Sequence, residues 1–149
     1  MNGIFDQKVK TAKALIKKAL KKHGNSIYVG FSGGKDSRAL LKMARRIESN
    51  ILVIHNEHTG EYIGKEKGVL IVRSPKKTIM PKFLTYVKIT AQLDGTRKDE
   101  DGFVMINKKN IHRSKMKNNY TKNGVWGLEV YFPLFYFTRK DVYDYLRTK

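Results

Sequence analysis

The stretch that most constrains the fold of this chain is residues 27–37, which read Ile-Tyr-Val-Gly-Phe-Ser-Gly-Gly-Lys-Asp-Ser. Its first part is β-branched and aromatic, which predicts a short buried strand, and the glycines that follow predict a tight turn. A strand, a glycine turn and a helix in this order are typical of a phosphate-binding loop. The helix is predicted over residues 38–47, where one face is apolar: Ala39, Leu40, Met43, Ala44 and Ile47.

The glycine turn is expected to bind phosphate through its backbone. Gly33 and Gly34 can adopt positive φ angles, so that their N–H groups point into one small concavity. A helix beginning near Ser37 would add free N–H groups and the positive end of its dipole. The hydroxyl of Ser32 and the ammonium of Lys35 would supply further donors. The alternative is a glycine turn with a purely structural role.

Asp36 is the unexpected member of this stretch, because a carboxylate beside a polyphosphate would repel it. The residue makes chemical sense if it holds a metal ion or a ribose hydroxyl. The loop is not a Walker A loop, which has four residues between its first glycine and the Gly-Lys pair. Asp36 is therefore our candidate metal ligand.

Composition limits the class of protein. The 149 residues predict one domain, 1–149, with a proper core. The chain contains no cysteine, which excludes disulfides, cysteine–zinc sites and thiol nucleophiles and fits a cytoplasmic protein. No stretch approaches the length and apolarity of a membrane span, and we expect no membrane partner.

The net charge of +18 is extreme for a small domain and predicts a polyanionic partner, such as tRNA or DNA. The alternative is a solvated, lysine-rich surface without a nucleic-acid partner. Residues 102–128 are basic and lack clear periodicity. We interpret them as a long loop, either a mobile surface loop or a site for single-stranded nucleic acid or a nucleotide base, since Tyr120 and Trp126 lie among the cations.

The remaining elements follow from periodicity. An amphipathic helix is predicted from Phe5 to His23 and ends at Gly24-Asn25. Its apolar stripe is Val9, Ala12, Leu15, Ile16, Ala19 and Leu20. Four further strands are predicted over residues 51–54, 69–72, 86–93 and 129–134, and the stretch from Pro81 stays unassigned between short helix and loop. A last helix is predicted over 141–147, capped by Thr138 with Asp141, and its inward residues are Tyr143 and Leu146.

A polar segment, residues 55–61, follows the strand at 51–54. Ligands of open α/β sheets bind at the carboxyl ends of strands, so Asn56 and Glu57 are candidates to read adenine or ribose. His55 and His58 are three residues apart, which is only a weak indication of a metal site without a third ligand.

Three separated segments resemble one family. Residues 32–37, Ser-Gly-Gly-Lys-Asp-Ser, resemble the SGGxDS signature of the PP-loop ATP pyrophosphatases, which have the adenine nucleotide alpha-hydrolase-like fold. Residues 95–100, Gly-Thr-Arg-Lys-Asp-Glu, resemble the G-x-R-x-x-E segment of the phosphoadenosine phosphosulfate (PAPS) reductase branch. Residues 132–146, from Phe-Pro-Leu to Asp-Val-Tyr-Asp-Tyr-Leu, are similar to the end of that branch. The resemblance implies an α/β fold, a three-layer α/β/α sandwich with a mainly parallel sheet of about five strands.

The resemblance also implies a function. It implies ATP and Mg²⁺ as cofactors, and cleavage of ATP to AMP and pyrophosphate while a substrate is adenylated. Lys35, Asp36 and Arg97 are the implied catalytic residues, with Arg97 balancing charge on the α-phosphate or a sulfate. The implied nucleotide-binding residues are Phe31, Ser32, Gly33, Gly34, Lys35, Asp36, Ser37, Asn56, Glu57, Gly95, Thr96 and Arg97.

The chain departs from the PAPS reductases in one decisive respect. Those enzymes use a catalytic cysteine, and this chain has none, so thiol-based reduction by this chain alone is excluded. An adenylyl-transferring enzyme is favoured, with a nucleic acid as an attractive substrate and a partner protein as a source of sulfur or amine chemistry. The alternatives are a homologue that binds a nucleotide or nucleic acid without turnover, and a subunit of a reductase or sulfurtransferase whose cysteine is on a partner.

Overall fold

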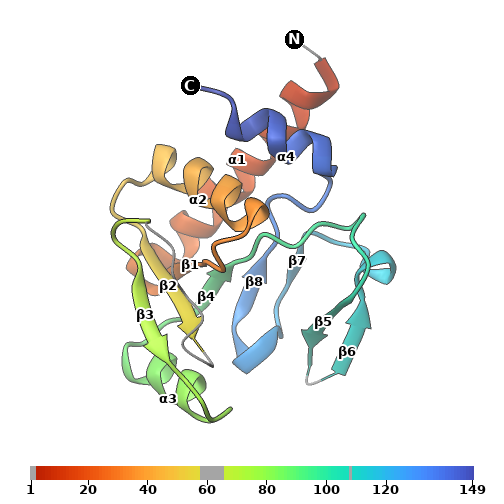
Figure 1. Ribbon diagram of the computed structural model, residues 1–149. Coiled ribbons are helices and arrows are strands. Elements are labelled where there is room, and N and C mark those ends of the chain that lie inside the picture. Colours follow the sequence, from red (N-terminus) through yellow and green to blue (C-terminus); the bar gives the residue numbers. More distant parts are fainter. Residues whose placement is uncertain (1–2, 58–65, 108) are drawn as a thin grey trace.

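The computed structural model describes residues 3–57, 66–107 and 109–149 (Figure 1). Its centre is a six-stranded sheet with strand order β3-β2-β1-β4-β8-β7. All neighbours pair in parallel except β7 and β8, which are antiparallel. The mainly parallel sheet confirms the predicted fold class. The strands are β1 Ile27–Gly30, β2 Leu52–Glu57, β3 Leu70–Arg73, β4 Ala91–Leu93, β7 Tyr120–Thr121 and β8 Glu129–Tyr131.

Helices cover both faces of this sheet (Figure 1). One face packs against α1 (Gly3–His23), α2 (Lys35–Ile47) and α4 (Arg139–Leu146), and the other packs against α3 (Ile79–Tyr86). Strand β1 shows the alternation: Ile27 and Val29 belong to the cluster under α1 and α2, whereas Tyr28 belongs to the cluster with α3. This alternation follows from the two-residue period of a strand. The result is a three-layer arrangement.

A separate antiparallel hairpin lies beside the sheet, formed by β5 (Phe103–Ile106) and β6 (Lys109–His112). Three 3-10 turns complete the chain: η1 (Gly24–Ser26), η2 (Arg113–Lys115) and η3 (Val125–Gly127). The prediction of one long unstructured loop over residues 102–128 is therefore wrong. The hairpin was missed because its strands are only four residues long and β6, which reads Lys-Asn-Ile-His, has a single aliphatic residue and no apolar alternation.

The terminal helices largely confirm their predictions. In α1 the predicted stripe faces the core, and Gly24 after its end has a φ of +57°. Helix α4 carries the predicted capping box between Thr138 and Asp141, but it begins at Arg139. Val142 and Tyr145 are its buried residues, so the inward placement of Tyr143, which is 37% exposed, is wrong.

One strand prediction fails over most of its length. Residues 86–93 were expected to form a strand, but α3 continues to Tyr86 and only Ala91–Leu93 is extended. Lys88, with φ of +59°, separates the two elements. A short apolar run does not distinguish a strand from a helix end, which explains the error. Within the described ranges, no helix combines the length and apolarity needed to cross a membrane.

The other strand boundaries differ in a way that affects the site. Strand β2 extends beyond Ile54 through the polar residues Asn56 and Glu57, because these pair with Val72 and Arg73 of β3. Strand β3 is shifted by one residue, and β8 ends at Tyr131 rather than at residue 134. Asn56 and Glu57 are thus strand residues at the carboxyl edge of the sheet and not members of a loop.

Candidate functional site

The glycine turn connects β1 to α2 at the carboxyl edge of the sheet. The helix begins at Lys35 with Gly34 as its N-cap, and its first α-helical hydrogen bond joins the Arg38 N–H to the Gly34 carbonyl at 3.0 Å. Gly33 has the predicted positive φ, at 89°, whereas Gly34 has a φ of −75°. The N–H groups of the first helical turn precede that bond and have no intrahelical acceptor, so they are suited to bind an anion.

The two serines of the turn hold its shape. The Ser37 hydroxyl accepts hydrogen bonds from the N–H groups of Ser32 (3.2 Å) and Gly33 (3.1 Å) and donates to the Gly34 carbonyl (3.1 Å). The Ser32 hydroxyl lies 3.1 Å from that of Ser37 and accepts from the Gly34 N–H at 3.3 Å. The turn is therefore preorganised, because the hydroxyls of Ser37 and Ser32 between them accept from the N–H groups of Ser32, Gly33 and Gly34.

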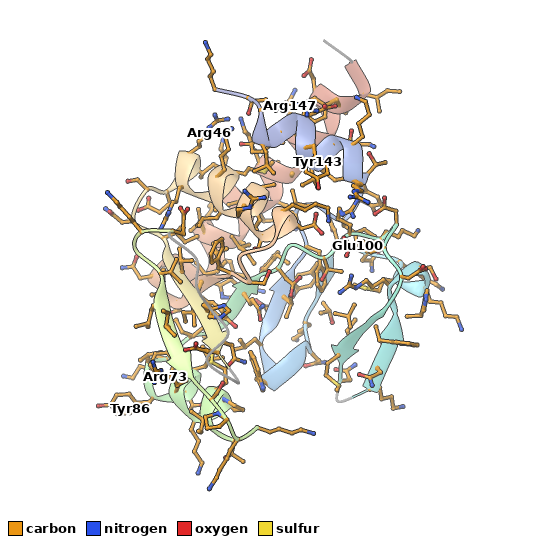
Figure 2. All side chains as sticks on the ribbon, viewed as in Figure 1. Arg46, Arg73, Tyr86, Glu100, Tyr143 and Arg147 are labelled. Atoms are coloured by element: carbon orange, nitrogen blue, oxygen red, sulfur yellow. The ribbon has the colours of Figure 1, made fainter. Side chains whose placement is uncertain are left out.

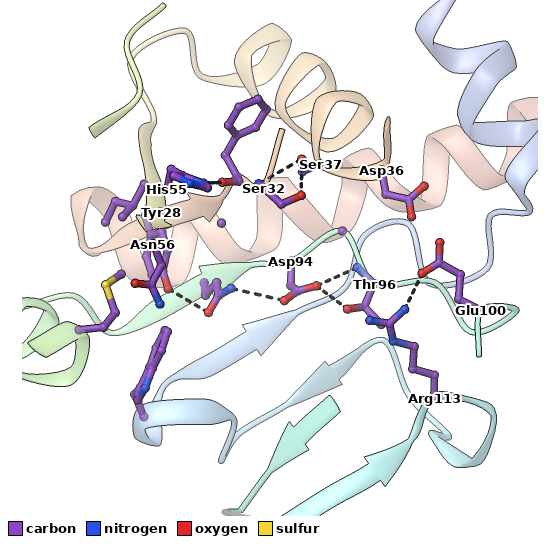
Figure 3. Close-up of a pocket in the computed structure, with 17 residues that line it drawn as sticks. Tyr28, Ser32, Asp36, Ser37, His55, Asn56, Asp94, Thr96, Glu100 and Arg113 are labelled. Atoms are coloured by element: carbon purple, nitrogen blue, oxygen red, sulfur yellow. Dashed lines mark hydrogen bonds and ion pairs between the residues drawn. The ribbon is translucent and has the colours of Figure 1, made fainter. Parts of the chain in front are cut away.

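Asp36 faces a second carboxyl, that of Glu100 (Figure 3). Burial raises the pKa of Asp36, and the contact with Glu100 adds to the rise, against the charge of Arg97. Burial alone would raise the pKa of Glu100 too. Hydrogen bonds with Asp36 and Arg97, and the charges of Arg97 and Arg113, instead lower the pKa of Glu100 to about 2. On acidification the first proton taken up by the pair resides on Asp36.

Three cations surround the acid pair. Arg97 is almost fully buried, and its Nη2 donates to Glu100 Oε1 at 2.6 Å while its Nε lies 3.3 Å from Asp36 Oδ1. The Nζ of Lys35 lies 3.4 Å from Asp36 Oδ1 and 3.6 Å from Glu100 Oε1. Arg113, which begins η2, forms an ion pair with the other oxygen of Glu100. Glu100 thereby links the sheet edge to the hairpin.

Arg97 has a further acidic partner, Asp99, at 3.0 Å from Nη1. Three carboxylates thus face one guanidinium, and opposite charges of this kind hold the pKa of Arg97 above its usual value although burial acts to lower it. Arg97 was predicted to contact phosphate or sulfate. In the structure it contacts carboxylates, and it does not line the cavity described next.

A cavity of about 390 Å³ opens beside the turn and the acid pair (Figure 3). This volume is within the range of small-molecule sites. Its polar wall contains groups from three strand ends: His55 and Asn56 of β2, Asp94 after β4, and Ser32 and Ser37 of the turn. Its apolar and aromatic wall contains Tyr28, Ile54, Met80 and Trp126.

The structure brings together seven of the predicted site residues on this cavity. Those that line it are Phe31, Ser32, Asp36, Ser37, Asn56, Gly95 and Thr96. Gly33, Gly34 and Lys35 adjoin it within the turn. Glu57 does not line it: its side chain is buried, and its Oε2 lies 3.6 Å from Arg73 Nε.

Gly95 has a specific steric role. A Cβ at this position would lie 3.3 Å from the backbone of Asp36, so the missing side chain lets the segment after β4 cross the start of α2 closely. Asp94 then accepts hydrogen bonds from the N–H (2.8 Å) and hydroxyl (2.5 Å) of Thr96. The predicted Gly-Thr-Arg segment is therefore positioned by packing against the turn.

Sequence reasoning missed several residues of the cavity. Asp94 and Gln92 were identifiable, because they lie at the end of β4 and meet the same strand-edge criterion that singled out Asn56. Gln92 accepts from the Tyr28 hydroxyl at 2.9 Å and donates to Asp94 at 3.4 Å. Arg113 and Trp126 come from the segment interpreted as a loop, and no local pattern indicates that they reach the cavity.

The structure does not support a metal site at His55 and His58. His55 is buried, with Nδ1 2.8 Å from the Phe31 carbonyl oxygen, and His58 lies outside the described residues. Among the residues that the structure does describe, no three His, Cys, Asp or Glu side chains form a group that could hold a metal. Asp36 and Glu100 remain a pair, which suits a metal shared with a substrate.

Comparison with known proteins finds fold relatives only. No family model matches, and no curated protein matches by sequence. Among solved structures, FMN adenylyltransferase from Candida glabrata in complex with FMN and the ATP analog AMPCPP is similar, with a TM-score of 0.68, 14% identity and coverage of 95% of this chain. The same enzyme with FAD and inorganic pyrophosphate gives 0.67 and 13% identity. This chain spans 55% of the length of that enzyme.

A second fold relative is the NH3-dependent NAD synthetase from Campylobacter jejuni subsp. jejuni NCTC 11168, in complex with the nitrate ion. The TM-score is 0.56 at 11% identity, over 99% of this chain and 73% of that one. The similarity to both structures extends over nearly the whole of this chain and agrees with the predicted α/β fold. The PAPS reductase branch stays a prediction.

Proposed function

We propose that this chain binds ATP in the cavity and transfers its adenylyl group to an acceptor, releasing pyrophosphate. The observation that carries the proposal is the meeting of the SGGKDS turn and the Asp36–Glu100 pair on one cavity at the carboxyl edge of a parallel sheet. Ligands of open α/β sheets bind at this edge. FMN adenylyltransferase supports the proposal as a fold relative whose name states the same class of reaction.

The phosphates would lie on the turn and the start of α2. The free N–H groups of the first helical turn and the Ser32 hydroxyl would donate to them, and Lys35 would neutralise charge. The 3.4 Å separation of the Lys35 ammonium from Asp36 keeps both groups at the same end of the cavity. These donors stabilise the pyrophosphate as its negative charge develops.

The acid pair fits Mg²⁺. Asp36 Oδ1 is buried and accepts no hydrogen bond from any described residue, and a second carboxyl faces Asp36. Mg²⁺ prefers one or two carboxylates together with substrate phosphates and water. Asp36 would be the first ligand and Glu100 the second. When bound, the ion neutralises charge on the phosphates.

Arg97 fits a positioning role better than direct contact with substrate. Its guanidinium is only 3% exposed, and three carboxylates already engage it. It therefore orients Glu100 and Asp36 and limits their mutual repulsion. This interpretation replaces the earlier expectation that Arg97 binds the α-phosphate.

The nucleoside would occupy the remainder of the cavity. Ile54 and Met80 supply an apolar wall for a base, and the Asn56 amide and the Asp94 carboxylate lie at strand ends within reach of polar edges. Glu57 is not part of this set. The acceptor would approach from the side of Arg113 and Trp126, which is the only wall contributed by the segment after residue 102 among the described residues.

The proposed reaction needs no cysteine, which this chain lacks. An acceptor oxygen attacks the α-phosphorus, the bond from that phosphorus to the bridging oxygen breaks, and pyrophosphate leaves with that oxygen. The product is an acceptor linked to AMP. Attack on this product by an amine or sulfur donor, supplied by a partner protein, is a further step of the same proposal.

Binding without turnover is the second candidate function. The Ser37 hydroxyl already satisfies two N–H groups of the turn, and Arg97 already satisfies its carboxylates. A site this complete can be stable without a reaction. The mutual approach of two carboxyls weighs against it, because binding a polyphosphate alone does not need them.

The test is incubation of the purified protein with α-labelled ATP and Mg²⁺, with and without bulk tRNA, followed by separation of the products. We expect pyrophosphate together with the α-label on the acceptor, or AMP once that adduct is cleaved, and loss of these products in Asp36→Ala with only a modest decrease in ATP affinity. Retained ATP binding without product in the wild type would establish the second candidate. Absence of ATP binding would refute both.

A further inference from the structure

The outward face of the β5–β6 hairpin exposes an aromatic pair. Phe103 is paired with His112 and Met105 with Asn110, and residues directly opposite in an antiparallel pair share a face. Phe103 is 63% exposed and Met105 39%. The rings of Phe103 and His112 are in edge contact, with centroids 5.3 Å apart and planes at 88°.

These outward side chains do not hold the hairpin in place. The opposite face, with Val104, Ile106 and Ile111, packs against the buried cluster of Met116, Val130, Phe132 and Phe135. The hairpin is also joined to the segment before η3, because the Asn107 N–H donates to the Asn123 carbonyl at 3.0 Å. An aromatic side chain that is neither buried nor needed for packing is available to a ligand.

The surroundings of this face are strongly basic. Residues 102–128 contain five lysines and one arginine and no acid. Within the described ranges Lys115, Lys117 and Lys122 are exposed and take part in no ion pair with a carboxylate. Lys109 is exposed as well, but it is paired with Ile106 and therefore lies on the inner face of the hairpin. Of the nearby acids, Asp99 and Glu100 are engaged by Arg97, and the exposed Asp101 lies just before the hairpin and offsets one of the positive charges. The local field is therefore positive.

We propose that the hairpin face binds single-stranded nucleic acid, with a base stacked on Phe103 and phosphates held by the surrounding lysines. Lysines interleaved with exposed aromatics are the physical requirements of such a surface. A single strand is favoured over a duplex because the ring of Phe103 can reach only an unpaired base. A protein partner is disfavoured because two apolar side chains make too small a patch for a stable interface.

The position of the hairpin connects this surface to the cavity. Arg113 follows β6 directly and lines the cavity, and Ile106 forms a β-bridge with Gly124, two residues before Trp126. A strand bound on the hairpin would thus end at the acceptor side of the cavity. This last step, which makes nucleic acid the acceptor, rests on the proposed function, whereas the binding itself does not.

The test is fluorescence anisotropy with a labelled thymidine oligomer of about 12 nucleotides, in the absence of ATP. We expect Phe103→Ala to weaken binding by at least about fivefold, the low end for loss of one base–aromatic stack. The matched control is Tyr86→Ala, since Tyr86 is 86% exposed on α3, on the side of the molecule away from the hairpin (Figure 2). This control should bind as the wild type does.

Charge is tested with a second matched pair. The double variant Lys115→Ala/Lys117→Ala, next to the hairpin, and the control Lys10→Ala/Lys17→Ala on α1 remove the same charge from exposed positions. We expect the hairpin variant to lose at least about threefold more affinity and to show a shallower salt dependence, because it releases fewer counterions on binding. Thermal unfolding of each variant verifies that the fold is retained.

Four outcomes would overturn the proposal. Two concern the wild type: absence of binding at low salt, and equal affinity for a duplex of the same length. The other two are equal affinity of wild type and Phe103→Ala, and equal losses in the two lysine variants. All of these measurements are made without ATP. A failure of the nucleic-acid proposal can therefore be distinguished from a failure of the proposed adenylyl transfer.

Discussion

Each end of the sheet holds a largely buried carboxylate that is surrounded by cations. Only the carboxylate at the carboxyl edge lies beside the cavity proposed as the functional site. At the carboxyl edge, Asp36 faces Glu100 beside a cavity. At the opposite end, Glu129 begins β8 and accepts from Lys22 and from the Tyr120 hydroxyl, both at 2.6 Å. Its second oxygen lies 2.5 Å from His23 Nε2.

The difference lies in how the charge is compensated. Burial would raise the pKa of Glu129, but its hydrogen bonds to Lys22 and Tyr120 and the charge of His23 lower it, so its neighbours stabilise the ionised form. Its Oε2, like Asp36 Oδ1, is buried and accepts no hydrogen bond from a described residue. The same contact with Glu129 raises the pKa of Tyr120 to about 12. Asp36 has a raised pKa and an acidic neighbour. Asp36 has ion pairs with Arg97 and Lys35, but burial and Glu100 outweigh them, so its ionised form is the less stabilised of the two. A carboxylate of this kind gains most from a bound metal ion.

The largest expected effect is on turnover. It is tested by replacing the carboxylate at each end of the sheet with the amide of the same length. Asp36→Asn should lower the rate of ATP cleavage by at least about hundredfold, the effect of removing one group that stabilises the transition state. Glu129→Gln should leave the rate unchanged. Initial rates with saturating ATP and Mg²⁺ measure both, and equal losses would abolish the distinction between the two ends.

The next effect is on the stability of the fold, and here the Glu129 variant should lose more than the Asp36 variant. Glu129→Ala leaves Lys22, Tyr120 and His23 without their shared acceptor, and we expect a loss of about 1–3 kcal/mol in the free energy of unfolding. Asp36→Ala should lose less, because it removes a carboxyl from an acidic neighbour. Urea titrations of both variants measure this difference. A larger loss of stability for Asp36→Ala than for Glu129→Ala would show that Asp36 contributes mainly to folding and would contradict this comparison.

The smallest effect is on the pH dependence of stability. The pKa of Glu100 falls from 4.5 to about 2 in the folded state, so its contribution is present above pH 4.5 and is lost as the pH falls toward 2. The raised pKa of Asp36 acts in the opposite sense, favouring the folded state on acidification. Glu100→Gln should therefore flatten the acid limb of stability between these pH values. An unchanged acid limb in urea midpoints would contradict this assignment.

The sequence predicted the local parts of the site well. The strand, turn and helix around residues 27–47 are specified by short-range patterns, and Gly33 adopts the expected positive φ. Gly95 and Thr96 line the same cavity as the turn, and their predicted role in nucleotide binding stays a prediction. These residues depend on backbone geometry, which a motif of a few residues determines.

Features set by long-range packing were less accessible. No local pattern indicates that Arg113 and Glu100 form an ion pair, because that contact depends on how the hairpin packs against β8. Glu57 was expected at the nucleotide, but pairing of β2 with β3 places it beside Arg73. Tyr143 was expected to point inward with Leu146, but Val142 and Tyr145 have the same i, i+3 spacing and form the buried face. Spacing alone does not decide between two such apolar pairs in a short helix.

The position of Glu100 has a thermodynamic consequence. One of its oxygens accepts from Arg97 at the sheet edge and the other pairs with Arg113 at the base of the hairpin. A cation bound at the acid pair would compete for those oxygens and weaken the hold on Arg113. A ligand in the cavity and a ligand on the hairpin would then share one coupling free energy, so each must change the affinity of the other by the same factor.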